Sequence, residues 1–290
     1  MSLKSRTARL SIWSNSLLII LNFTVGFISG SISIISEGIH TIMDLLAAIM
    51  AYFSIRIADT PPDEQHPYGH GKYENISGVI EALLIYVASG WIIWEAVQKL
   101  LAPHHIDNYG LSLGILVMFF GSVVNYFVSK RLYKVADETD SIALKADALH
   151  LKTHIYTSAG IGIGMILIWL TGWYILDPII AILVAIFILK EATEILIHAF
   201  KPLTDTSLSK DELETITEII DQHLDECMTY HKLRTRKGGS HRYIDFHLEV
   251  TKDMSVQASH ELCDRIEQQI EQHIPNAEVT IHVEPKDCPT

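Results

Sequence analysis

The sequence has few cysteines and no cysteine motif. Its three cysteines, Cys227, Cys263 and Cys288, all lie in the last third of the chain, and none is in C-x-x-C spacing with another. This number and spacing predict neither a disulfide framework nor a zinc ribbon. The chain also has no H-E-x-x-H motif, so it lacks that signature of helical zinc hydrolases.

The sequence is also short of positive charge, with a formal net charge of −12 at pH 7. This charge argues against nucleic acid as a partner and is compatible with attracting cations. No internal repeat or low-complexity segment is evident, so a repeat architecture is not expected.

Apolar residues are abundant: 49% of the 290 residues are hydrophobic, and the mean hydropathy is +0.24. The charges are uneven, because residues 1–204 hold 13 Lys or Arg and 16 Asp or Glu, whereas residues 205–290 hold 9 and 18. We therefore expect a transmembrane domain over residues 1–204 and an acidic, soluble domain over residues 205–290.

Six apolar segments are long enough to cross a bilayer as helices. They lie at about residues 10–30, 33–56, 75–100, 110–132, 143–170 and 175–199. The turns near residues 30–31, 103–105 and 172–173 contain no Lys or Arg, whereas the connections on the other side do. The positive-inside rule then predicts a multi-pass protein of the cell inner (plasma) membrane with both termini in the cytoplasm. No cleavage site follows the first segment, which we interpret as a retained span.

The acidic domain has the pattern helix, hairpin, helix, strand. A helix begins at Ser209, strands follow near 228–236 and 241–251, a second helix runs from 255 to 273, and the last strand spans 278–284. Apolar and polar residues alternate through the second strand. This order predicts an αββαβ ferredoxin-like domain.

Four metal-ligand side chains fall inside two of the apolar segments. His40 and Asp44 in the second span, and His150 and His154 in the fifth, are each four residues apart, so each pair shares one helix face about 40° wide. Ionisable groups at this depth are costly and mark functional sites. Imidazole and carboxylate together suit Zn²⁺ rather than Mg²⁺ or Ca²⁺. The alternative is that each is a hydrogen-bonded structural group.

Asp147 lies three residues before His150. It is either an outer-shell partner that fixes an imidazole tautomer or a charge at the surface end of the helix.

Two further groups lie outside the spans. The loop after the second span contains Asp63, His66 and His70, which are either a second ion site or ordinary loop residues. The acidic domain is rich in imidazole and contains His231, His247, His260, His282 and Glu284. Because several of these residues lie on strands, they are candidates for a cytoplasmic metal site.

Several of these motifs together resemble the cation diffusion facilitators, a family of bacterial proton-coupled exporters of divalent metals. They are Ser36-Glu37-Gly38-x-His40-x3-Asp44, His66-Pro-Tyr-Gly-His70-Gly-Lys72-x-Glu74, Ala146-Asp147-Ala-Leu-His150, Leu233-Arg234-Thr-Arg236 and His247-Leu-Glu249. The resemblance covers nearly the whole chain. It implies a homodimer of six-helix protomers, a central site at His40, Asp44, His150 and His154, a loop site, and a binuclear site in the cytoplasmic domain.

The chain departs from the family pattern at His154, where Asp is usual. The substitution leaves a bound divalent ion with one formally negative ligand instead of two, which disfavours hard Mn²⁺. It also gives the site three imidazoles that titrate near neutral pH.

The sequence thus favours a Zn²⁺:proton antiporter that exports metal from the cytoplasm and is not an enzyme. An exporter selective for Fe²⁺, Co²⁺ or Cd²⁺ is the first alternative. Two others are an intramembrane metal-dependent hydrolase, with Glu37 as its general base, and a membrane metal sensor.

Overall fold

The computed structural model describes residues 2–29, 32–101, 111–171, 173 and 175–287. It divides into two compact units, Met1–Phe200 and Lys201–Thr290. The boundary expected at residues 204 and 205 falls just inside the second unit, at the end of the 3₁₀ helix η1 (Lys201–Thr204).

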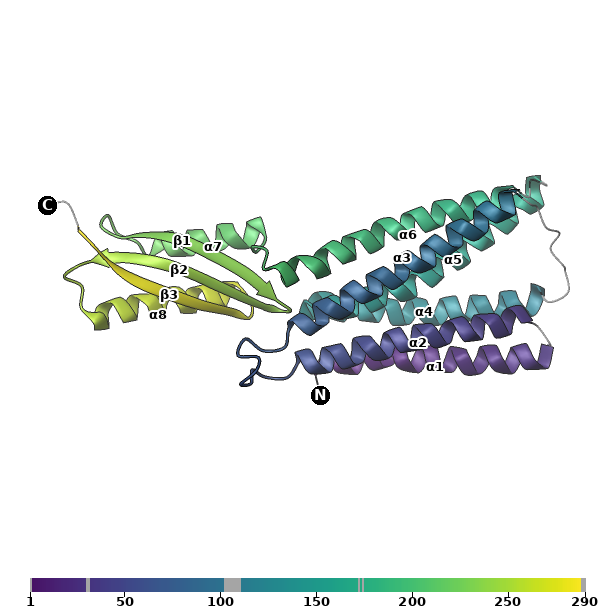
Figure 1. Ribbon diagram of the computed structural model, residues 1–290, viewed down its shortest axis with the longest axis horizontal. Helices are drawn as coiled ribbons and strands as arrows, with labels where there is room; N and C mark the ends of the chain where they lie inside the picture. The colour runs from purple at the N-terminus through teal and green to yellow at the C-terminus, as the bar shows by residue number, and fades with distance from the viewer. Residues whose placement is uncertain (1, 30–31, 102–110, 172, 174, 288–290) are drawn as a thin grey trace. The chain divides into compact units, whose positions relative to one another are not determined.

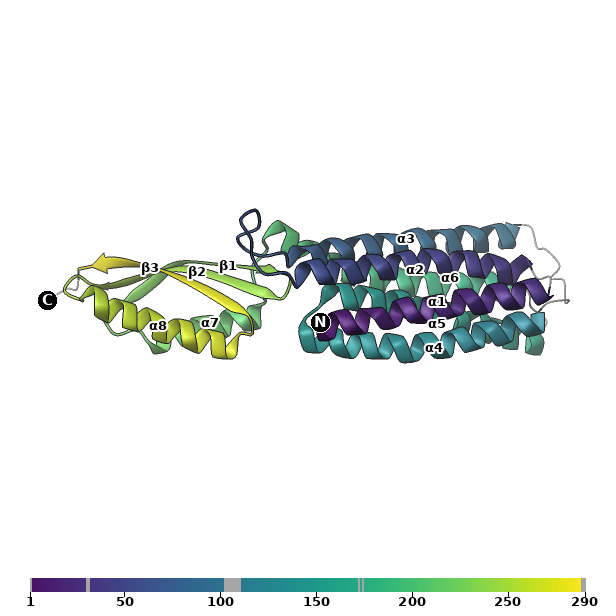
Figure 2. The same cartoon turned by 90° about the horizontal axis from the view of Figure 1, so that it is seen from below.

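The first unit is a bundle of six long helices that run alongside one another (Figures 1 and 2). Their bounds are α1 Leu3–Ser29, α2 Ile32–Ala58, α3 Lys72–Leu101, α4 Leu111–Thr139, α5 Ile142–Thr171 and α6 Leu176–Phe200. The six expected helices are confirmed. The largest differences are that α1 begins, and α4 ends, seven residues beyond the predicted span, because both helices continue through polar residues that a hydropathy window leaves out. Of the expected turns, residues 30–31, 103–105 and 172 lie outside the described residues.

Within the described residues, three helical segments are long and apolar enough to cross a membrane. They are Leu3–Ile28, Glu37–Ala58 and Lys72–Leu101. Large apolar side chains such as Trp13, Phe53 and Trp91 are more than half exposed on the bundle surface. Because these large apolar side chains point outward, the surface of the bundle is suited to contact with lipid and not with water.

Small residues line the helix contacts of the bundle. One buried cluster contains Ala8, Ala136, Ala143 and Ala148, which are at most 2% exposed and lie on α1, α4 and α5. A second cluster joins α3, α5 and α6 through residues that include Ala82, Ala146 and Ala192. Small side chains let helix backbones approach closely, which is the main source of packing energy between helices in lipid.

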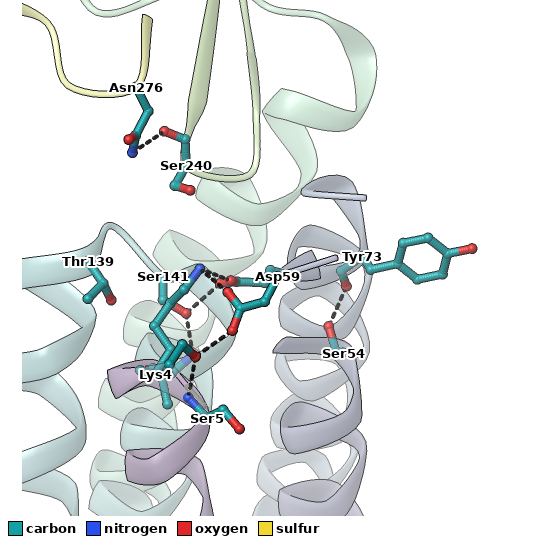
Figure 3. A network of polar contacts seen from close by, with 12 residues as sticks. Lys4, Ser5, Ser54, Asp59, Tyr73, Thr139, Ser141, Ser240 and Asn276 are labelled. Carbon is teal, nitrogen blue, oxygen red and sulfur yellow. Dashed lines mark hydrogen bonds and ion pairs between the residues drawn. The ribbon is translucent and has the colours of Figure 1, made fainter. Parts of the chain in front are cut away.

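A polar network ties several helices together at one end of the bundle (Figure 3). Lys4 Nζ on α1 lies 2.7 Å from Glu74 Oε1 at the start of α3 and 3.3 Å from Asp59 Oδ1 just after α2. Ser141, in the turn between α4 and α5, donates a hydrogen bond to the second oxygen of Glu74. The turn is sharp, since Asp140 has a left-handed φ of 51°. Glu74 therefore links α1, α3 and the α4–α5 turn while only 3% exposed.

The second unit has the predicted αββαβ order, with α7 Lys210–Gln222, β1 Thr229–Gly238, β2 His241–Thr251, α8 Val256–His273 and β3 Ala277–Lys286. The sheet order is β1-β2-β3, with β1 antiparallel and β3 parallel to β2. β1 extends to Gly238, two residues beyond the predicted strand, so the hairpin turn is tighter than the sequence indicates. Gly239 occupies this turn at φ 64°, a conformation that favours glycine.

Both helices of the second unit pack on one face of its sheet (Figure 2). Ile244, Phe246 and Leu248 of β2 are at most 1% exposed and meet Ile216 and Ile266 of the helices. The alternating residues of β2 therefore point to the opposite face, because side chains along a strand alternate in direction. That opposite face carries His247 and Glu249.

Helix α7 begins with a reciprocal capping box. The Glu212 amide donates to Ser209 Oγ at 3.3 Å, and Glu212 Oε2 accepts from the Ser209 amide at 3.0 Å. Arg242 Nε of β2 lies 3.0 Å from the other Glu212 oxygen. Burial alone would raise the pKa of Glu212, but the hydrogen bonds from Ser209 and Arg242 outweigh it and hold this pKa below its usual value.

We predict that Glu212→Ala destabilises α7 by about 1 kcal/mol at pH 7, since it removes one half of the cap and the Arg242 partner. Amide exchange of α7 in the full chain should then become roughly fivefold faster. A carboxylate with a lowered folded-state pKa contributes stability above its unfolded pKa, and this contribution is lost as pH falls. The difference between variant and parent should therefore shrink below about pH 4. Glu214→Ala, on the exposed side of the same helix, serves as control, and equal effects of the two variants would contradict the prediction.

Candidate metal centres

The central group is formed where α2 and α5 face each other. Helical spacing places His40 above Asp44 on α2 and His150 above His154 on α5, as the sequence predicts. Gly38 lets α2 approach α1 closely, because a Cβ at this position would lie 3.3 Å from the Cβ of Asn22. The neighbouring Thr41 accepts a hydrogen bond from Asn22 at 3.4 Å, which fixes this part of α2 against α1.

Asp44 is the hub of the central group. It is 5% exposed, and its Oδ1 lies 2.9 Å from His150 Nε2 while its Oδ2 lies 3.3 Å from His154 Nε2. His40 completes the group, since one ligand atom each of His40, Asp44 and His154 lies within 4.8 Å of the others. The rings of His150 and His154 are 5.4 Å apart at their centroids. The structure thus brings together all four predicted residues.

The central group contains a buried imidazole nitrogen that forms no hydrogen bond with the described residues. This nitrogen is Nδ1 of His150. A buried polar atom of this kind carries a desolvation cost that a bound cation would remove. One carboxylate and three imidazoles are a donor set suited to a borderline divalent ion.

Asp147 does not fit either of its two expected roles. It is 2% exposed, so it is not a charge at the surface end of the helix. Its Oδ1 accepts a hydrogen bond from Ser11 Oγ of α1 at 2.9 Å, and its Oδ2 has no hydrogen-bond partner among the described residues. Asp147 therefore joins α5 to α1 instead of orienting an imidazole through a hydrogen bond.

The loop between α2 and α3 brings its three predicted residues together. Asp63 Oδ1 lies 3.3 Å from His66 Nδ1, and Asp63 Oδ2 lies 3.4 Å from His70 Nε2. The loop folds back because Gly69 adopts φ 75° and donates its amide to the His66 carbonyl. The pKa of Asp63 is lowered, first by the backbone amide of His66, which donates to Oδ1 at 2.6 Å. A carboxylate held ionised between two imidazoles is ready to bind a cation.

The third group lies on the helix-free face of the sheet in the second unit. His247 Nδ1 is 2.7 Å from Glu284 Oε1, and His231 Nε2 is 3.4 Å from Glu284 Oε2. The hydrogen bond from His247 is the main cause that lowers the pKa of Glu284. A β-bulge between His231 and Arg234 turns His231 toward this group, with Lys232 at a left-handed φ of 52°.

The other predicted residues of the second unit behave differently from one another. His282 lies at the edge of the group, 4.7 Å from the His247 ring and 3.6 Å from Glu284 Oε1. His260 is separate from it: its side chain is 74% exposed and pairs with Asp264 on its own helix at 3.5 Å. Cys227 is disulfide-bonded, Cys263 is a buried free thiol, and Cys288 lies outside the described residues.

Sequence reasoning missed two buried carboxylates of α3, Glu74 and Glu81. Glu74 appeared only as part of a motif, and Glu81 lies seven residues later on the same helix face. The signal was present, because an acidic residue inside an apolar span indicates function by default.

A six-helix membrane bundle with a metal-ligand group at its centre defines a class of protein, the metal-ion transporters. The sequence profile described as "Cation efflux transmembrane domain" matches residues 8–204, and that described as "Cation efflux protein, cytoplasmic domain" matches residues 208–286. The chain belongs to the cation efflux (cation diffusion facilitator) family. It is therefore a multi-pass transporter of divalent metal cations and not an enzyme.

Two relatives match most of the chain. An uncharacterized transporter of Synechocystis sp. is 36% identical over 90% of this chain and 84% of its own length. The cation-efflux pump FieF of Salmonella newport is 28% identical over 98% of this chain and 93% of its own. Among solved structures, the metal-bound C-terminal domain of the CzcD transporter from Thermotoga maritima is 29% identical over 27% of this chain and 94% of that chain, with a TM-score of 0.25.

The geometry of the third group predicts unequal roles for its histidines. We expect His247→Ala to weaken Zn²⁺ binding to the second unit of the full chain by about 10- to 100-fold, because it removes an imidazole at the centre of the group. His260→Ala should have a much smaller effect, since this ring is exposed and lies apart. Isothermal titration of both variants measures the difference, and a larger loss for His260→Ala would overturn the assignment.

Proposed function

We propose that the chain exports Zn²⁺ from the cytoplasm in exchange for protons, with His40, Asp44, His150 and His154 as the transport site. The observation that carries this proposal is Asp44, a carboxylate 5% exposed inside a membrane bundle and held by two histidines of another helix. Burying a charge of this kind costs free energy, so an intramembrane carboxylate indicates a functional site by default. The three-imidazole, one-carboxylate donor set favours Zn²⁺ over the harder divalent ions.

Competition for the same ligands couples the two fluxes. An imidazole binds metal only when it is neutral, so metal and protons exclude each other at three of the four positions. In the cytoplasm-facing state the deprotonated site takes metal, and protonation on the outer side favours its release. The bundle alternates between the two openings, so that the site is exposed to one side at a time.

The orientation rests on the distribution of basic residues. Lys4, Arg56, Lys72, Lys134 and Lys201 all lie near the helix ends on the side of both termini. Positive residues gather on the cytoplasmic side of membrane proteins, so both termini and the second unit lie in the cytoplasm of a cell with this protein in its inner (plasma) membrane.

The chain acts as a homodimer that pairs through its cytoplasmic domain. The match of residues 208–286 to the cytoplasmic domain of the family supports this arrangement. The loop group (Asp63, His66, His70) and the group of the second unit bind cytoplasmic metal. They favour the transport-competent conformation by binding it more tightly, which couples flux to metal supply.

Removal of the hub carboxylate tests the transport site. We predict that Asp44→Ala lowers Zn²⁺ uptake into sealed vesicles with an imposed pH gradient by more than about 100-fold, since the site loses its one negative ligand. Asp137→Ala, at an exposed position near the end of α4, is the matched control and should transport as the parent does. Zn²⁺ uptake by Asp44→Ala at the parental rate would refute the site. The same vesicles, assayed with Fe²⁺, Co²⁺ and Cd²⁺, rank the alternative substrates.

His154 tests the metal preference. We predict that His154→Asp raises Mn²⁺ transport relative to Zn²⁺ by about tenfold, or roughly 1.4 kcal/mol, because a second carboxylate favours a hard cation. Parallel uptake of the two ions by parent and variant measures the ratio. An unchanged ratio would show that residue 154 does not set selectivity.

A further inference from the structure

A pair of buried carboxylates lies outside the three metal groups. Glu81 on α3 is 1% exposed and Asp147 on α5 is 2% exposed. The residues next to them, Ala82 and Ala146, belong to one buried cluster, so α3 and α5 are in contact at this level. The negative charge of Asp147 acts directly on Glu81.

These carboxylates lack the hydrogen bonds that buried oxygens normally have. Neither Glu81 oxygen has a hydrogen-bond partner, and Oδ2 of Asp147 has none either, within the part of the chain that the structure describes. Ser77 lies one helical turn before Glu81. The Ser77 hydroxyl faces Glu81 as a weak donor, and three carboxylate oxygens at this level lack a hydrogen bond of normal geometry among the described residues.

Two neighbouring carboxylates in a membrane bundle cannot both stay ionised and unpaired, so they either take up protons or bind a cation. Each buried charge costs several kcal/mol unless an opposite charge and further hydrogen bonds compensate it. No Lys or Arg among the described residues forms an ion pair with either Glu81 or Asp147. A cation shared by both carboxylates removes the repulsion and satisfies the free oxygens at once.

We propose that Glu81 and Asp147 form a second intramembrane site, which binds a divalent cation through oxygen ligands alone. One or two carboxylates plus waters are the usual ligands of Mg²⁺ and Mn²⁺. This site therefore differs in chemistry from the imidazole-rich central group. Asp147 lies three residues before His150 on α5, so a cation held there is about one helical turn from the central group. The Glu81–Asp147 site would bind a transported cation transiently beside the central group. Its presence does not depend on which metal the central group prefers.

Mn²⁺ binding to the full chain in detergent tests this site, because loss of the free-ion electron paramagnetic resonance signal counts bound Mn²⁺. We expect Glu81→Gln and Asp147→Asn each to bind one Mn²⁺ per chain fewer than the parent. Both replacements keep side-chain size and remove only the charge. Glu95→Gln, at a half-exposed position further along α3, is the control and should bind as many as the parent.

Equal Mn²⁺ binding by the parent, Glu81→Gln and Asp147→Asn would overturn the proposal. If the pH dependence of Zn²⁺ uptake in Glu81→Gln is altered as well, Glu81 binds a proton and not a metal ion. Circular dichroism of each variant in detergent measures whether the helices of the bundle are formed, and Asp147→Asn serves if Glu81→Gln does not fold. Transport by Asp44→Ala tests the central group separately.

Discussion

The arrangement of α2 and α5 depends on the electrostatic cost of burying a carboxylate inside an apolar bundle. Asp44 lies between His150 and His154 with 5% of its surface exposed, and its charge persists there only because α5 supplies two imidazoles. The contact joins α2 to α5. In the transport site that we propose, the same contact opens for metal to bind between these residues, so the cation replaces an interaction that joins the two helices.

Other buried acidic residues in the bundle have different partners, and the partner defines the role of each. Glu74 has Lys4 and Ser141, which makes it a structural link at one end of the bundle. Glu81 and Asp147 have no cationic partner among the described residues, which makes them candidates for binding a mobile ion. In lipid, where water cannot compensate a missing contact, this difference separates structural charges from functional ones.

The second unit shows which structural features local sequence patterns predict and which they do not. The alternation in β2 and the Ser209 cap correctly predict a strand with one buried face and the start of α7, because both depend on residues close in the chain. The bulge that turns His231 toward Glu284 was not predicted. Its position depends on pairing with β2. The exposed position of His260 was also not predicted, since a helix face can be assigned only once its neighbours are known.

The sequence by itself determined the six helices, the αββαβ domain and the ligand types of the central group. These follow from hydropathy, from periodicity and from four-residue spacing on single helices. Only the tertiary structure decided which ligands meet, that Asp147 bonds Ser11 instead of orienting a histidine, and that Glu81 lies buried near it. The reason is physical: spacing fixes where a side chain points from its own helix, whereas contacts between helices depend on packing that no single segment contains.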